Sequence, residues 1–230
     1  MMNIEKVIQL IEENSHVYAI LKNCPYRILK KWSIQDYQQG DIVLRQGETV
    51  DSFCIIVKGK ANIYMMSESG KKYSQVIYQN GDFIGELEIF DHLPSACFVE
   101  ALSDLTLIRI QADDFMDWIA VDTHMSQYFN RNLAKYLYNL SKKAGMDSLY
   151  SLRHRLCNYL INHMNPYQEG QFIVRMSRSQ ISDHLAVTSR SVNRVLYNWK
   201  EQGIVGIESD SIIILDIDQL NEEKENSLLE

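Results

Sequence analysis

Short apolar segments separated by glycines dominate residues 36–111 of the chain. Six of its ten glycines lie in this stretch, at spacings typical of turns between antiparallel strands. The apolar segments are residues 42–44, 53–57, 61–65, 73–78, 97–99 and 105–110. This pattern predicts an all-β domain, a compact barrel or sandwich. Upstream, Ile4, Val7, Ile8 and Ile11 recur at helical spacing and predict a leading helix that packs on that domain.

The hydrophobic period changes to that of a long helix after this domain. No glycine or proline interrupts residues 114–143, and Gly145 is expected to end the helix. One face carries apolar side chains at steps of three and four, typical of a coiled-coil seam. These are Met125, Phe129, Leu133, Leu137 and Leu140. The seam predicts a dimerisation helix, the alternative being a helix that only packs on the β domain.

A third region, residues 146–218, has the spacing of a winged helix-turn-helix. It begins with a predicted helix over 149–163 and a short strand over 172–174. Ser177 and Gln180 form a capping box ahead of a helix that ends near His184, and Thr188 is placed to cap the next. That helix has a buried stripe of Val192, Val195, Leu196 and Trp199. Residues 204–207 and 211–215 then predict a hairpin, the wing.

Charge is unevenly distributed over these regions, although the chain carries a net charge of −7. Residues 146–206 have 7 Lys/Arg against 4 Asp/Glu, whereas residues 207–230 have 1 against 8. The net charge of the whole chain is therefore negative although residues 146–206 are basic, because the acidic residues 207–230 outweigh them. Residues 219–230 are expected to be a flexible acidic tail.

Polar side chains occupy the face of residues 189–201 opposite the apolar stripe. Arginine, amide and hydroxyl groups are those that read base edges in the major groove. We expect the base-reading residues to be Ser189, Arg190, Asn193 and Arg194, and the phosphate contacts to be Ser177, Arg178 and Ser179. The alternative is an ordinary solvated helix face, which the preceding capped helix and the following wing disfavour.

These motifs together resemble the CRP/FNR family of bacterial transcription regulators over residues 10–216. Gly81–Leu87, which reads GDFIGEL, is similar to the family's G-D-x-x-G-E signature, and Thr188–Arg194 is similar to its recognition helix. The run Phe83–Ile89 resembles the YeiL-like branch. The resemblance implies an α+β fold with four parts in chain order. These are an N-terminal double-stranded β-helix (a jelly-roll-like β-roll) that acts as sensor, 1–113; a long dimerisation helix, 114–145; a winged helix-turn-helix, 146–218; and the tail, 219–230.

The resemblance also implies an effector pocket, from which one expected group is missing. Its candidate residues are Gly85, Glu86, Leu87, Ser95, Ala96, Leu140 and Ser141. Glu86 matches the family's ribose-binding glutamate, but no Lys or Arg lies between Lys72 and Arg109 to bind a cyclic phosphate. Cyclic AMP is therefore disfavoured, and Glu86 is equally well explained as a structural residue. We expect no cofactor, because Cys24 alone cannot hold an iron-sulfur cluster and the histidines are too scattered for haem.

The sequence thus predicts a homodimeric regulator that binds an inverted repeat of double-stranded DNA in the cytoplasm. RNA polymerase and a small-molecule effector are further candidate partners, whereas a membrane is not, since no apolar run approaches about 20 residues. Arg190 stands where the best-known family members carry glutamate, which predicts a different half-site. No nucleophile–base pair, metal-ligand spacing or phosphate loop indicates an enzyme. The alternative is a signalling module that binds a cyclic nucleotide or small metabolite and acts through protein contacts.

Overall fold

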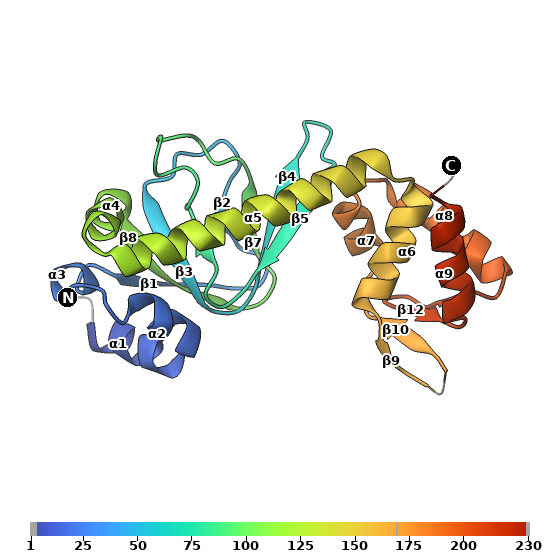
Figure 1. Ribbon diagram of the computed structural model, residues 1–230, viewed down its shortest axis with the longest axis horizontal. Coiled ribbons are helices and arrows are strands. Elements are labelled where there is room, and N and C mark those ends of the chain that lie inside the picture. The colour runs from blue at the N-terminus through green and yellow to red at the C-terminus, as the bar shows by residue number, and fades with distance from the viewer. Residues whose placement is uncertain (1–3, 169, 229–230) are drawn as a thin grey trace. The chain divides into compact units, whose positions relative to one another are not determined.

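The computed structural model describes residues 4–168 and 170–228. It divides into two compact units, one of residues 4–70 and 74–137 and the other of residues 71–73 and 138–228. The main boundary falls within one helix, α5 (Thr123–Leu149). Parts of this helix, which is labelled in Figure 1, therefore belong to each of the two units.

The first unit contains two four-stranded sheets, in the orders β1-β8-β3-β6 and β2-β7-β4-β5. Their strands are β1 (Ser33–Tyr37), β2 (Ile42–Leu44), β3 (Ser52–Lys58), β4 (Ala61–Met66), β5 (Lys72–Tyr78), β6 (Phe83–Ile84), β7 (Phe98–Ala101) and β8 (Leu105–Gln111). Strands β3 and β8 pair antiparallel, with Ile55 opposite Ile108, and both side chains are fully buried. Strands far apart in the chain are thus neighbours, which confirms the predicted β-roll.

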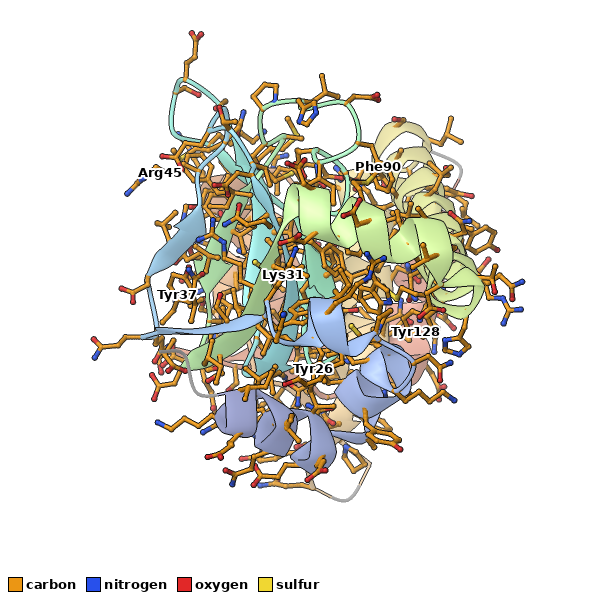
Figure 2. The ribbon with its side chains drawn as sticks, turned by 90° about the vertical axis from the view of Figure 1, so that its left-hand side faces the viewer. Tyr26, Lys31, Tyr37, Arg45, Phe90 and Tyr128 are labelled. Carbon is orange, nitrogen blue, oxygen red and sulfur yellow. The ribbon has the colours of Figure 1, made fainter. Side chains whose placement is uncertain are left out.

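Helices cover one side of this roll and share its core. They are α1 (Ile4–Glu13), α2 (Ser15–Leu21), α3 (Tyr26–Leu29) and α4 (Ala112–Val121). Val7 and Ile11 of α1 are buried, as predicted for the leading helix. At the centre, the rings of Phe53 and Phe115 stack with centroids 3.9 Å apart. Lys31, labelled in Figure 2, forms an ion pair with Asp114 of α4, which joins the end of the helical segment to α4.

The predicted single helix over 114–145 is wrong in its boundaries. The structure has two helices, α4 and α5, separated at Asp122, whose backbone is extended (φ −108°, ψ 94°). Its carboxylate accepts from Trp118 Nε1 at 3.0 Å and from the Met125 backbone N–H at 3.1 Å. An aspartate that caps a helix start competes with continuation of the preceding helix. Gly145 does not end α5, which continues to Leu149.

The predicted dimer seam is also wrong in its first two members. Met125 and Phe129 are 0% and 2% exposed and belong to the core of the first unit, where the Phe129 ring lies 5.4 Å from that of Phe115. Leu133 is partly buried against the same core. Leu137 and Leu140 are 66% and 46% exposed. The N-terminal half of the stripe therefore packs on the β domain, and only its C-terminal half is available to a partner.

The second unit places helices around a small sheet of order β11-β12-β10-β9. Its further elements are α6 (Leu152–His163), β9 (Asn165–Pro166), β10 (Phe172–Val174), α7 (Arg178–His184), α8 (Ser189–Glu201), β11 (Val205–Ile207), β12 (Ile212–Ile214) and α9 (Ile217–Asn226). Strands β11 and β12 pair antiparallel and form the predicted wing. Leu156 and Leu160 of α6 pack in one core with the stripe of α8.

The expected flexible tail is wrong over residues 219–226, because α9 is a docked helix. Asp216 caps it through the Gln219 N–H (2.9 Å), and Leu220 is fully buried. Glu223 accepts a hydrogen bond from Trp199 Nε1 at 2.7 Å and pairs with Arg153 of α6. Burial acts to raise the pKa of Glu223, but the hydrogen bonds from Arg153 and Trp199 and the charge of Arg153 outweigh it and lower the pKa overall. One carboxylate of the acidic segment, Glu223, thus has partners from other elements that hold the helix in place.

Replacing Leu220 with alanine should lower the free energy of unfolding of the second unit by about 2–4 kcal/mol, since it removes a fully buried leucine. Urea unfolding followed by circular dichroism measures the loss. Leu228→Ala is the matched control, because Leu228 is 47% exposed and should lose little. Equal stability of Leu220→Ala and the natural chain would show that α9 is not docked in solution.

Candidate nucleic-acid interface and effector cavity

Helices α7 and α8 form the predicted helix-turn-helix, and side-chain caps fix the start of each. Ser177 Oγ accepts from the Gln180 N–H at 3.2 Å, while Gln180 Oε1 accepts from the Ser177 N–H at 2.9 Å. Thr188 Oγ1 likewise accepts from the Ser191 N–H at 3.2 Å. These bonds satisfy backbone donors that a helix start leaves unpaired. The cap at Thr188 therefore fixes the residue at which α8 begins.

The apolar stripe of α8 decides which of its faces is exposed. Val192, Leu196 and Trp199 are fully buried, and Val195 is 7% exposed. Four anchors at helical spacing hold the helix against the core of the second unit. The opposite face is consequently exposed to solvent.

Arg190, Arg194 and Tyr197 are exposed on that opposite face. The two arginines are four residues apart and therefore project side by side, one helical turn apart. Each guanidinium can donate two hydrogen bonds to one guanine edge. Figure 1 shows α7 and α8 within the second unit.

The two other base-reading candidates are more enclosed. Ser189 is exposed, but its Oγ lies 3.0 Å from Ser182 Oγ, a bond that ties α8 to α7. Asn193 is half-buried, and its Oδ1 is buried without a hydrogen-bond partner among the described residues. The two arginine side chains thus extend into solvent, where they can reach a ligand. The polar atoms of Ser189 and Asn193 lie nearer the surface between α7 and α8 or are buried.

The phosphate candidates lie along a groove of about 820 Å³ between the start of α7 and the wing. Ser177 and Ser179 line it, but the Ser177 hydroxyl is engaged in the capping box; Arg178 is half-buried and does not line it. Sequence reasoning missed Arg175, an exposed cation that lines the groove. Its position directly after β10 and before the cap was the available signal. Also missed were two wing-tip carboxylates on the far wall, Glu208 and Asp210.

The effector cavity of the first unit forms around Gly85 and Glu86. Gly85 has φ +87°, and a Cβ there would lie 2.4 Å from the Ser52 carbonyl oxygen, so only glycine fits. This tight turn directs Glu86 inward, where it is 5% exposed and accepts from Tyr78 Oη at 2.9 Å. Glu88, 8% exposed, accepts from the Ala96 N–H at 3.3 Å.

Five of the predicted pocket residues line this one cavity, and two do not. The cavity measures about 70 Å³, and its lining includes Gly85, Glu86, Leu87, Ser95 and Ala96. Leu140 and Ser141 belong to the second unit, whereas the lining comes from the first.

The cavity is acidic, because its described lining residues include Glu86 and Glu88 and no lysine or arginine. Arg45, next to the lining residue Leu44, points away from the roll in Figure 2 and pairs with Glu48 at 3.8 Å. Burial raises the pKa of Glu86 to about 7, and the nearby Glu88 adds to this. A bound phosphate would need a cation beside it, but the cavity offers a second carboxylate, Glu88, instead. Binding of anions is therefore disfavoured.

An aromatic contact closes the roll beside this cavity. The rings of Tyr78 and Tyr136 stack with centroids 5.4 Å apart, and Tyr136 Oη donates to Asp82 Oδ1 at 3.0 Å. The Tyr78 hydroxyl thus satisfies Glu86 while its ring packs on α5. Burial raises the pKa of both tyrosines, so both remain neutral donors.

Two family models match the chain in the order of its two units. A cyclic nucleotide-binding domain matches residues 34–122, and a Crp-like helix-turn-helix domain matches residues 154–223. The chain belongs to the CRP/FNR family. It is a transcription regulator with a helix-turn-helix DNA-binding domain and not an enzyme. Its predicted YeiL-like branch within the CRP/FNR family stays a prediction.

Relatives of this CRP/FNR regulator match most of its length at low identity. The CRP-like cAMP-activated global transcriptional regulator of Mycobacterium tuberculosis is 24% identical over 190 residues, 80% of this chain and 85% of that protein. The probable transcriptional regulator flp of Lacticaseibacillus casei is 23% identical, over 78% and 82%. The c-di-GMP responsive global regulator CLP of Xanthomonas campestris shares the fold, with a TM-score of 0.74 at 16% identity, covering 82% and 96%. Within the described residues of the CRP/FNR chain, no helix has the length and apolar character needed to cross a bilayer.

Replacing Arg190 or Arg194 with alanine should weaken binding to a selected operator by about 1–3 kcal/mol each, because each loses a bidentate base contact. Binding to random DNA should change far less. Fluorescence anisotropy on both DNAs measures the ratio, and Arg45→Ala controls for the loss of an exposed arginine elsewhere. If Arg190→Ala kept the sequence preference unchanged while Arg194→Ala abolished it, Arg190 would not be a base reader.

Stability of the first unit should fall as pH rises from about 4.5 to about 7, because the folded state holds a proton on Glu86 that the unfolded state releases. Glu86→Gln keeps an acceptor for Tyr78 and removes the charge. It should exceed the natural chain at pH 8 by on the order of 2–3 kcal/mol and match it near pH 4.5. Urea unfolding at both pH values tests this, with the exposed Glu68→Gln as control. A pH-independent gap between the two chains would contradict it.

Proposed function

We propose that this regulator acts as a homodimer on an inverted-repeat operator and that cyclic AMP does not control it. The exposed pair Arg190 and Arg194 on a helix held by four buried anchors is the observation that carries the DNA-reading part. In a two-fold dimer, two such helices enter successive major grooves about 34 Å apart.

The exposed half of α5 supports the dimer. Leu137, Tyr138 and Leu140 are 66%, 64% and 46% exposed, a concentration of large apolar side chains on four successive residues. Leu137 and Leu140 are separated by three positions and share a helix face, as in a coiled-coil seam. The same face of a second copy would bury both.

The effector cavity supports independence from cyclic AMP. A volume of about 70 Å³ is far below the roughly 300 Å³ at which pockets for drug-sized ligands begin. Glu86 already has a hydroxyl partner in Tyr78, so it is not an unpaired acceptor that awaits a ribose. The Glu88 carboxylate, and Glu86 where it is ionised, would repel a cyclic phosphate.

The positions of the charged side chains also support separate roles for phosphate contacts and base contacts. Arg175, Arg178 and Ser179 supply phosphate contacts beside α7, which set register without reading sequence. The acidic wing tip, Glu208 and Asp210, disfavours phosphate there. Arg190 donates to guanine where a glutamate would accept from cytosine, so the half-site differs from the one best known in the family. RNA polymerase and a small-molecule effector are the further partners that we propose.

A DNA-binding titration with and without cyclic nucleotides tests the proposal. Operators selected from random sequence should be inverted repeats that bind two chains per duplex. Affinity should fall steeply between 50 and 200 mM salt, by about tenfold for every two phosphate contacts that the protein makes, and neither cyclic AMP nor cyclic GMP should change it.

A large nucleotide-induced gain in affinity would contradict the cavity argument. Binding of one chain per duplex would contradict the dimer. Weak, salt-insensitive binding would instead favour the signalling module that acts through protein contacts, because phosphate contacts must release counterions.

A further inference from the structure

A second cavity lies within the second unit, where the end of α5 meets α6 and α7. Its volume is about 220 Å³. It is lined by Lys143, Met146, Asp147, Arg155, Asn158, Tyr159, Asn162, His163, His184 and Leu185. These residues do not include the base-reading arginines, so the cavity is separate from the recognition face. The proposed function makes no use of it.

The cavity has a surplus of positive charge. The side chains of Lys143 and Arg155 are only 16% and 12% exposed. Asp147 is the one carboxylate among the described lining residues, 3.7 Å from Lys143 Nζ and 2.9 Å from Arg155 Nη1. Two cations thus share one anion in a partly buried place, where charges are poorly screened.

One buried donor of these cations has no hydrogen-bond partner among the described residues. Lys143 Nζ donates to the His184 carbonyl oxygen at 3.1 Å, and Arg155 Nη1 donates to that of Leu185 at 3.0 Å. Arg155 Nε is buried and has no acceptor among the described residues. A buried donor without a partner is costly, and a cationic one more so. An acceptor beyond the described atoms would relieve this cost.

Two imidazoles flank the same cavity. The ring centroids of His163 and His184 lie 4.2 and 4.7 Å from that of Tyr159. His163 Nδ1 lies 2.8 Å from the Tyr159 carbonyl oxygen, so Nδ1 carries a proton and donates. Burial, together with the charges of Lys143 and His163, lowers the pKa of His184 to about 4. A bound anion would act in the opposite direction and favour the imidazolium.

We infer that this cavity binds a small polyvalent oxyanion, either inorganic phosphate or a compact polycarboxylate. Lys143 and Arg155 supply the charge, and the Asn158 and Asn162 amides supply neutral donors. The volume admits such an anion but lies below the range for ligands of nucleotide size. The lining comes from α5, α6 and α7. The bound anion would therefore hold α7, the first helix of the helix-turn-helix, in place against the end of α5.

The test uses the full chain and two probes, sodium phosphate and sodium citrate, at an ionic strength held constant with sodium chloride. Isothermal titration calorimetry should show saturable binding of one probe per chain, and the probe that binds identifies the source. Histidine NMR should show the pKa of His184 rising when the site is saturated. These measurements need no DNA, so their outcome is independent of the proposed operator binding.

Lys143→Met should weaken the affinity for the anion by about tenfold or more, because it removes a charge-assisted contact. Lys142→Met is the matched control, since Lys142 is exposed on the same helix and should leave affinity unchanged. His184→Gln gives a second variant should Lys143→Met fold poorly, and it should also weaken the anion affinity measured by calorimetry.

No saturable binding of either probe would overturn the inference. So would an equal loss in the Lys142 and Lys143 variants, which would indicate general charge attraction. Displacement of the bound anion by duplex DNA would place these cations in the DNA interface instead, and would likewise overturn it.

Discussion

The start of α5 is buried in the aromatic core of the first unit, and this burial fixes the position and rotation of the helix there. Met125 and Phe129 enter a cluster that includes Phe53, Phe83 and Phe115, so the start of the helix cannot rotate or slide without opening that core. Asp122 fixes where the helix begins by accepting from the Trp118 ring and the Met125 backbone. Only the part beyond Leu133 exposes apolar side chains. The buried start of the helix therefore fixes the orientation of the exposed face that we propose a second copy would cover.

The first unit has the fold of a cyclic nucleotide-binding domain, with a small cavity lined by Glu86 and Glu88 inside it. Gly85 still makes the turn that buries Glu86, because no other residue fits against the Ser52 carbonyl. The carboxylate, however, meets a tyrosine and a second glutamate in a small cavity. Fold and ligand chemistry are separable, since the first rests on backbone turns and packing and the second on a few side chains.

Acidic residues in the second unit contribute to structure as well as to net charge. Glu223 lies at the centre of α6, α8 and α9, where it pairs with Arg153 and accepts from Trp199. Asp147 bridges Lys143 and Arg155 in the same way at the end of α5. Such bridges join helices to one another, and one of these helices, α8, carries the exposed Arg190 and Arg194 on another face. The DNA-binding surface thus remains compatible with an acidic chain.

The sequence by itself determined the order of the parts, the capping box of α7, the buried stripe of α8 and the wing. These depend on short-range rules, in which period, cap and turn residues act within a few positions. It also revealed the missing cation near Glu86, because a lysine or arginine is visible without a structure. Tertiary structure alone decided which half of the α5 stripe is buried, since both halves have the same local pattern. It alone turned the acidic tail into α9 and brought Arg175 beside the acidic wing tip, because partners distant in the chain decide whether a charge is solvated or paired.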